Sequence, residues 1–294
     1  MNGGLRKRSG EGRDLTRPPV PEALPAPIFD NHAHLEFEDG LQPLEPRESL
    51  DRAGSVGVRG VVQVGTDLET SRWGAALAAT DPRVLAAVAL HPNEAPKLFE
   101  QGLLSAQLSE IARLATQPRV RAVGETGLDF FRTGEDGRAA QIESFEAHID
   151  IAKASGLALQ IHDRDAHDEV VATLKRVGAP DRTVFHCFSG DAALARVCNE
   201  NGWYMSFAGT MTFKNAPALR EALAVARPEL VLVETDAPFL TPEPYRGRPN
   251  APYLLPHTVR RMAETLEEDL QELCERVAAN TERVYGSWDP DIDE

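Results

Sequence analysis

The chain has 294 residues, of which 42% are hydrophobic and 26% charged, and its formal net charge is −15. This composition is typical of a soluble globular protein, and the length is close to the roughly 250 residues of a single α/β barrel. The acidic balance disfavours a high-affinity nucleic-acid binder, because such proteins usually present a basic surface, although carboxylates that bind metal cations would weaken this argument.

The first 26 residues are rich in arginine, proline and glycine. Basic residues and then prolines occupy the place where a secretory signal would carry its apolar stretch. We predict that residues 1–26 are a disordered Pro/Arg-rich tail and that residues 27–288 form the folded domain.

The cysteines and the lengths of the apolar runs indicate the cellular compartment in which the protein is expected to work. The cysteines are odd in number and lack C-x-x-C spacing, which disfavours a disulfide framework or a structural zinc cluster and suits a reducing environment. No apolar run reaches about 18 residues, so we expect no membrane span. We therefore predict a cytoplasmic protein, with no obligate protein partner evident. The cysteines are Cys187, Cys198 and Cys274.

From residue 27 onward, short apolar runs alternate with longer segments of helical spacing. Most runs are near-continuous in Val, Ile, Leu and Ala, which is typical of strands buried on both faces. Eight such strands alternating with helices predict a single (β/α)8 TIM barrel. A doubly wound open sheet is the alternative, but its nucleotide-binding glycine motifs are missing. The predicted strands are 28–30, 60–64, 84–90, 120–124, 157–161, 183–185, 203–206 and 230–233.

Histidine and acidic residues follow the ends of these predicted strands. In such a barrel these positions form the rim at the C-terminal ends of the strands, where the active sites of this fold lie. Fold and chemistry therefore indicate one site at this rim. The residues are Asp30, His32, His34, His91, Glu125, Asp129, His162, His186 and Asp236.

The spacing of the first two rim histidines suits a metal ion. His32 and His34 are two residues apart, so their side chains point the same way, with Cα atoms roughly 6.6 Å apart. Asp236 ends the last strand, which lies beside the first in a closed barrel. A carboxylate buried there would cost several kcal/mol without a partner, and a metal ion supplies that partner.

Glu125 lies close to glycines on both sides, where each of its oxygens could approach a different ion. His162 and His186 follow consecutive strands and are therefore neighbours. We predict two divalent ions, and the mixed ligands suit Zn²⁺, Mn²⁺, Ni²⁺ or Co²⁺ better than Mg²⁺, although ligand type does not exclude Mg²⁺. The predicted ligands are His32, His34, Glu125 and Asp236 for one ion, and Glu125, His162 and His186 for the other.

Two ions about 3.5–4 Å apart would lower the pKa of a shared water and stabilise the attacking and leaving oxygens of a displacement. Glu125, as the bridging ligand, and Asp236, as an acceptor of the water's proton, are the predicted catalytic residues. His91, Arg164 and Arg246 are predicted to bind substrate, the arginines through bidentate hydrogen bonds to phosphate. For each arginine a salt bridge to a nearby carboxylate is an equal alternative.

Two further histidines, His148 and His167, lie on helix-like segments and are expected to be solvated. Ser189 follows His186 closely, but no GxSxG motif exists, so a serine hydrolase is disfavoured.

Five motifs surround the predicted ligands: FDNHAHL (29–35), GETGLD (124–129), IHDRDA (161–166), HCFSG (186–190) and ETDAPFL (234–240). Together they resemble the TatD family of metal-dependent deoxyribonucleases, over residues 28–286. The resemblance implies an amidohydrolase-like barrel, two metal ions, and 3′→5′ exonuclease or related phosphodiesterase action on DNA, which would be bound with low affinity.

All six ligand positions of the family are filled here. The chain departs from the family in having Ala251 where a glutamate is usual, which we expect to affect the order of that loop, and Ala33 where a cysteine is common.

Two other functions remain open. A related hydrolase could cleave an amide or carboxyl ester, including the bond in D-aminoacyl-tRNA, because a metal polarises a carbonyl as well as a phosphoryl group. Relatives that act on cyclic amides often carry a bridging lysine where Glu125 stands, so the glutamate favours phosphate esters. A non-catalytic binding protein on a decayed barrel should first lose a ligand, and none is lost.

Overall fold

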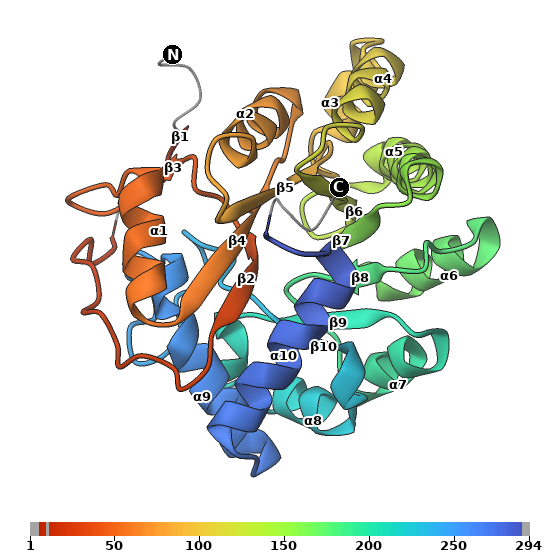
Figure 1. The fold of residues 1–294 in the computed structure, drawn as a ribbon. Helices are drawn as coiled ribbons and strands as arrows, with labels where there is room; N and C mark the ends of the chain where they lie inside the picture. The colour runs from red at the N-terminus through yellow and green to blue at the C-terminus, as the bar shows by residue number, and fades with distance from the viewer. Residues whose placement is uncertain (1–5, 10–11, 290–294) are drawn as a thin grey trace.

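The computed structural model describes residues 6–9 and 12–289. Its centre is one sheet of eight parallel strands in the order β10-β9-β8-β7-β6-β5-β4-β2. Helices surround the strands (Figure 1). The strands are β2 (Ile28–Ala33), β4 (Val58–Val64), β5 (Val84–Val88), β6 (Val120–Asp129), β7 (Ala158–Arg164), β8 (Thr183–Phe185), β9 (Tyr204–Phe207) and β10 (Val231–Val233).

The sheet closes between its first and last strands. The amide of Asp236 donates to the carbonyl of His32 over 2.9 Å, and the amide of His34 donates to the carbonyl of Ala237 over 2.8 Å. The predicted (β/α)8 barrel is therefore confirmed, and all eight predicted strands are present. Three strands that carry predicted ligands extend further than predicted. The first continues to Ala33, the fourth to Asp129 and the fifth to Arg164, so His32, Glu125 and His162 lie within strands and not beyond their ends.

Helices link consecutive strands and pack their apolar faces on the outside of the barrel. No helix in the described ranges is long and apolar enough to cross a membrane. The helices are α1 (Pro46–Ser55), α2 (Leu68–Ala78), α3 (Ala95–Glu100), α4 (Leu104–Leu114), α5 (Glu135–Ser155), α6 (His167–Val177), α7 (Ala192–Asn201), α8 (Pro217–Val225), α9 (Leu255–Leu266) and α10 (Leu270–Tyr285), with short 3-10 turns η1 (Gly209–Thr212), η2 (Pro228–Leu230) and η3 (Pro252–Leu254).

The N-terminal end of the barrel is filled by aromatic side chains. Trp288, after α10, stacks on Phe29 with ring centroids 4.1 Å apart, and its Nε1 donates to the carbonyl of Arg83 over 3.2 Å. Apolar side chains from β4, β5 and β10 fill the interior above this pair. Within the barrel interior, the C-terminal end is therefore the open end, where polar residues replace these apolar layers.

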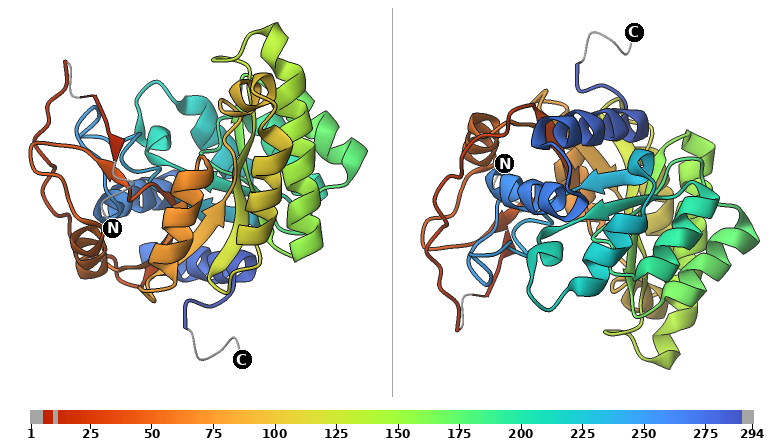
Figure 2. Two further views of the ribbon diagram at one scale, coloured as in Figure 1. Left: turned by 90° about the horizontal axis from the view of Figure 1, so that it is seen from above. Right: turned by 90° about the horizontal axis from the view of Figure 1, so that it is seen from below.

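The N-terminal segment packs on the barrel, so the prediction of a disordered tail is wrong for residues 12–26. Its arginines, which suggested disorder by composition, find fixed partners: Arg13 pairs with Asp39 at 2.8 Å. Pro18 accepts a hydrogen bond from the hydroxyl of Tyr253, and Leu24 is buried. In both views of Figure 2 the segment follows one side of the barrel. Residues 1–5 and 10–11 lie outside the described residues.

Before this packed stretch, β1 (Arg6–Lys7) pairs in parallel with β3 (Phe37–Glu38), a two-residue strand that follows β2. The segment therefore reaches the loop that leaves the end of β2.

His148 is buried, contrary to the expectation that it would be solvated. Its Nδ1 donates to the carbonyl of Ser144 over 2.7 Å, and its Nε2 accepts the amide of Leu90 over 3.0 Å, which joins α5 to the chain after β5. The neutral ring satisfies both bonds. Burial lowers the pKa of His148 to about 4 although the Ser144 carbonyl favours the charged form.

This shift predicts a pH-dependent stability. The pKa of His148 is about 4 in the folded state and roughly 6.5 in the unfolded state. Between these values the unfolded chain binds a proton that the folded chain does not, so stability is complete above the window and is lost as pH falls through it. The loss approaches about 3 kcal/mol. Urea denaturation of His148→Gln at several pH values should show a shallower dependence than the parent over this window. Equal slopes would contradict the prediction.

Candidate metal centre

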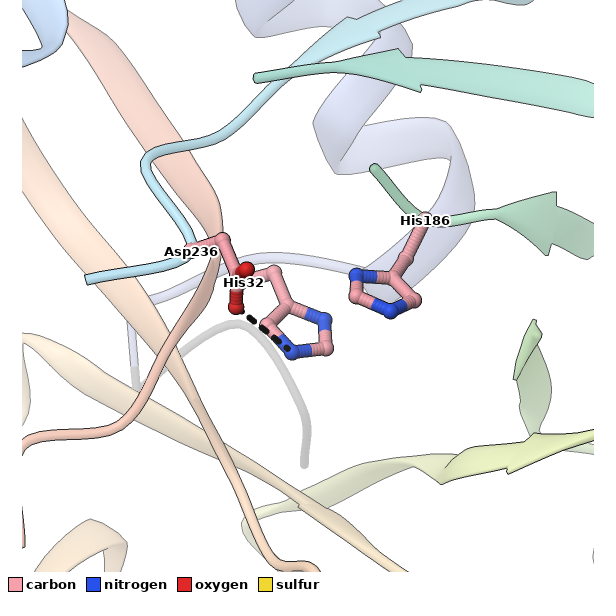
Figure 3. Close-up of side chains that lie close together, drawn as sticks. All are labelled: His32, His186 and Asp236. Carbon is pink, nitrogen blue, oxygen red and sulfur yellow. Dashed lines mark ion pairs between the residues drawn. The ribbon is translucent and has the colours of Figure 1, made fainter. Parts of the chain in front are cut away.

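Six predicted ligands meet at the C-terminal end of the barrel. Figure 3 shows three of them, from β2, the end of β8 and the chain after β10, pointing toward one another. All are buried except His162, which is partly exposed. They are His32, His34, Glu125, His162, His186 and Asp236.

The closing seam of the barrel supplies one group of donors. His32 Nε2 lies 3.2 Å from His34 Nε2. Asp236 Oδ1 lies 3.8 Å from His32 Nε2 and 3.5 Å from His34 Nε2. The backbone hydrogen bonds between the segment after β10 and the end of β2 thus bring these side chains close together.

Glu125 stands between this group and a second one. Its Oε1 is 3.7 Å from His34 Nε2, whereas its Oε2 is 2.8 Å from His186 Nε2 and 3.4 Å from His162 Nδ1. The two oxygens therefore face different histidines, which is the arrangement required of a carboxylate shared by two ions.

Glycines in β6 make this placement possible. The register of β6 against β7 shifts between Val123 and Thr126, around Glu125. At Gly127, φ is +134° and an added Cβ would lie 2.1 Å from the carbonyl oxygen of His162. Only glycine permits β7 to approach so closely, and this approach brings His162 beside Glu125.

Three of the histidines are oriented by acceptors on their other ring nitrogen. His34 Nδ1 lies 2.9 Å from the carbonyl of Val64. Since a carbonyl only accepts, Nδ1 carries a proton, and the neutral ring would present the lone pair of Nε2 to a metal ion on the side of Glu125 and Asp236. Carboxylates hold the other two rings in the same way and raise their basicity, a common feature of metal-binding histidines.

These two carboxylates were missed as orienting groups from the sequence. Glu234 Oε1 is 3.2 Å from His186 Nδ1, and Asp129 Oδ2 is 3.2 Å from His162 Nε2. Glu234 precedes Asp236 by two residues, and Asp129 follows Glu125 by four. The signal was present as acidic residues spaced along the same strands as the ligands, but their partners lie on other strands.

The charge balance of the centre fits bound cations. Among described residues, the ion pairs of Glu125, Glu234 and Asp236 involve histidines and no arginine or lysine. Buried carboxylates need compensation, and divalent ions would supply it.

Protonation of the histidines can also compensate the charge of these buried carboxylates. Burial opposes a charged His186, but Glu125 and Glu234 outweigh it and raise its pKa well above the ordinary value. Burial lowers the pKa of His32 well below its ordinary value, with His186 adding to the effect. A ring that stays neutral at ordinary pH is ready to bind a metal ion.

His91 also faces this centre, with a different orientation. Its Nδ1 accepts the amide of Asn93 over 3.0 Å, so the neutral ring carries its proton on Nε2, which lies 3.8 Å from Glu125 Oε1. A protonated nitrogen donates hydrogen bonds and does not bind metal. The predicted role of His91 in substrate binding is compatible with this orientation.

Arg164 is the last residue of β7, and Arg246 lies in the loop after β10; within the described residues neither forms a hydrogen bond or ion pair with the six ligands. Their guanidinium carbons lie 3.9 Å from the ring centroid of Phe131 and 4.1 Å from that of Phe213, respectively. Within the described chain, neither arginine pairs with a carboxylate, so the salt-bridge alternative is not observed.

Ala251, where the family usually has glutamate, leaves the nearby loop anchored. Asn250 Nδ2 donates to the carbonyls of Thr235 (3.0 Å) and Phe239 (2.6 Å), and Ala251 itself is buried. The expected effect on loop order is therefore offset by the neighbouring amide.

The barrel and its histidine–carboxylate cluster define a metal-dependent hydrolase with an amidohydrolase-like TIM-barrel fold. Residues 29–286 match the family described as TatD related DNase, and the chain belongs to this family.

Relatives and solved structures agree with this assignment. An uncharacterized metal-dependent hydrolase TatD of Mycobacterium tuberculosis is 45% identical over 263 residues, which cover 88% of this chain and 98% of the relative. A protein of Citrobacter rodentium named 3′-5′ ssDNA/RNA exonuclease TatD is 35% identical over 250 residues, 81% of this chain and 91% of the relative. The crystal structure of YJJV, a TatD homologue of Escherichia coli, has a TM-score of 0.80 and 28% identity, with 88% and 98% of the two chains covered.

The orienting role of Glu234 can be tested by metal affinity. Glu234→Gln keeps an acceptor for His186 but removes the charge that raises the basicity of the ring. We expect it to bind Mn²⁺ about tenfold more weakly than the parent, by isothermal titration calorimetry, with an unchanged circular dichroism spectrum. Glu229→Gln, which changes a partly exposed carboxylate at the opposite end of β10, is the control and should bind as the parent does. Equal affinities of the parent and Glu234→Gln would refute the role.

Proposed function

We propose that the protein hydrolyses phosphodiester bonds of single-stranded DNA from the 3′ end, with two divalent metal ions held by the six-residue cluster. The observation that carries the proposal is Glu125, whose two oxygens face two separate sets of histidines. The exonuclease name of the Citrobacter rodentium relative supports the substrate.

His32, His34 and Asp236 would hold one ion together with Glu125, and His162 and His186 would hold the other with the same glutamate. When bound, two such ions polarise a phosphoryl group and lower the pKa of a water molecule. Zn²⁺, Mn²⁺, Ni²⁺ and Co²⁺ suit the mixed ligands, and Mg²⁺ is also compatible with nuclease chemistry.

Asp236 is the proposed acceptor of the water's proton. It is 9% exposed, against 5% for Glu125, so it is the more accessible carboxylate of the cluster. Only its Oδ1 lies near the histidines, which leaves the second oxygen for the proton. His91 Nε2 would donate a hydrogen bond to the substrate at the same opening.

The function can be tested by digestion of 3′- and 5′-labelled single-stranded DNA. We expect metal-loaded protein to release labelled nucleotides first from the 3′ end, EDTA to abolish release, and Mn²⁺ to restore it. Asp236→Asn should lower kcat by roughly a hundredfold or more, because it removes a proton acceptor and a ligand charge. Glu264→Gln, an exposed carboxylate on α9, should leave the rate unchanged.

The competing hydrolase function is tested in the same experiment with D-aminoacyl-tRNA as a second substrate. Release of the amino acid without release of nucleotides from either DNA would overturn the proposal. The metal centre would then act on a carboxyl ester.

A further inference from the structure

An exposed aromatic ring lies just after Asp129, at the C-terminal end of the barrel. Phe131, two residues beyond the end of β6, is 62% exposed. The guanidinium carbon of Arg164, at the end of β7, is 3.9 Å from its ring centroid. A cation over one face of an aromatic ring is attracted to it, which holds the two side chains together.

The backbone fixes this pair to the barrel. Asp129 and Arg164 are paired in the β6–β7 ladder, and the amide of Phe130 donates to the carbonyl of Arg164 over 2.9 Å. At the residue after Phe131, the amide of Arg132 donates to Asp129 Oδ1 over 2.8 Å. Phe131 is therefore held between two fixed neighbours.

The same contacts connect the ring to the catalytic cluster. Asp129, which holds the turn through Oδ1, also holds His162 through Oδ2. Arg164 follows His162 by two residues on β7. A group stacked on Phe131 thus lies next to the part of the rim that carries His162.

An exposed phenylalanine paired with a guanidinium matches the chemistry of an unpaired nucleotide. Bases stack on aromatic side chains whatever their sequence, and a guanidinium can bind the adjoining phosphate. Stacking also suits this protein because it does not depend on net charge, and the chain carries −15. The second such pair, Arg246 over Phe213, is less suited, since Phe213 is only partly exposed.

We propose that Phe131, supported by Arg164, is a stacking platform for an unpaired nucleobase of the substrate strand. This inference rests on the proposed phosphodiesterase function. It assigns to Phe131 the selection of single-stranded nucleic acid over phosphodiesters that lack bases.

Two oligomers of equal length separate stacking from phosphate binding: fluorescein-labelled oligo(dT), and an oligomer with abasic sites at its last four 3′ positions. Fluorescence anisotropy with metal-free protein measures binding without turnover, and Mn²⁺-loaded protein gives KM and kcat. Phe131→Ala should weaken binding of oligo(dT), and raise its KM, by about fivefold or more, with little change for the abasic oligomer. Phe131→Trp should retain the parent's preference for bases.

Phe99→Ala is the matched control. Phe99 is 54% exposed on α3, and in the described part of the chain no guanidinium lies over its ring. This variant should bind both oligomers as the parent does.

The outcomes distinguish the two proposals. If the parent binds oligo(dT) better than the abasic oligomer, and Phe131→Ala alone removes the difference, the platform stands even where neither oligomer is cleaved. The proposed nuclease function would then fail by itself. If the parent cleaves DNA but Phe131→Ala and the parent bind both oligomers alike, the platform is wrong and the nuclease function is unaffected.

Discussion

The structure of the rim depends on one buried carboxylate that must satisfy two groups of histidines. Glu125 reaches His34 with one oxygen and both His162 and His186 with the other. Burial opposes the charge of Glu125, but the neighbouring His186 lowers the pKa of Glu125 well below its ordinary value. Binding of divalent ions at this centre would displace protons from its histidines, so cation binding and proton release would be coupled there.

A second layer of acceptors decides which nitrogen each histidine turns toward Glu125 or Asp236. The carbonyl of Val64, the carboxylate of Glu234 and the carboxylate of Asp129 each occupy the opposite nitrogen of one ring. His91 has the reverse orientation, because a backbone amide donates to its Nδ1. Neighbours from different parts of the chain thus give histidines of the same rim opposite tautomers.

The N-terminal segment precedes the matched family region, yet it borders the metal centre. Arg8 lies over the ring of Phe239 at 4.8 Å, and Phe239 contacts the ring of His34 with centroids 6.0 Å apart. The guanidinium also donates to the carbonyl of Pro238. This segment therefore supports, from outside, the same loop that carries Asp236.

The sequence by itself determined the barrel and the histidines and carboxylates that gather at its rim. Eight near-continuous apolar runs can be buried on both faces only in a parallel sheet, and histidines and carboxylates at their ends must then share one rim. The sequence did not determine the packing of residues 12–26, because composition shows low hydrophobicity and not which carbonyls and carboxylates the arginines will meet. It likewise gave no reason to expect His148 inside, since its partner Leu90 is 58 residues away.

Only the tertiary structure decided which contacts and orientations the individual side chains of the site adopt. Whether Glu125 is shared, whether His91 donates, and whether Arg164 covers Phe131 depend on distances between strands and on hydrogen bonds between residues far apart in the chain. The position of a residue along its predicted strand fixes the end of the barrel at which its side chain lies. It does not fix its rotamer or tautomer, because these are set by neighbours that meet only when the sheet closes.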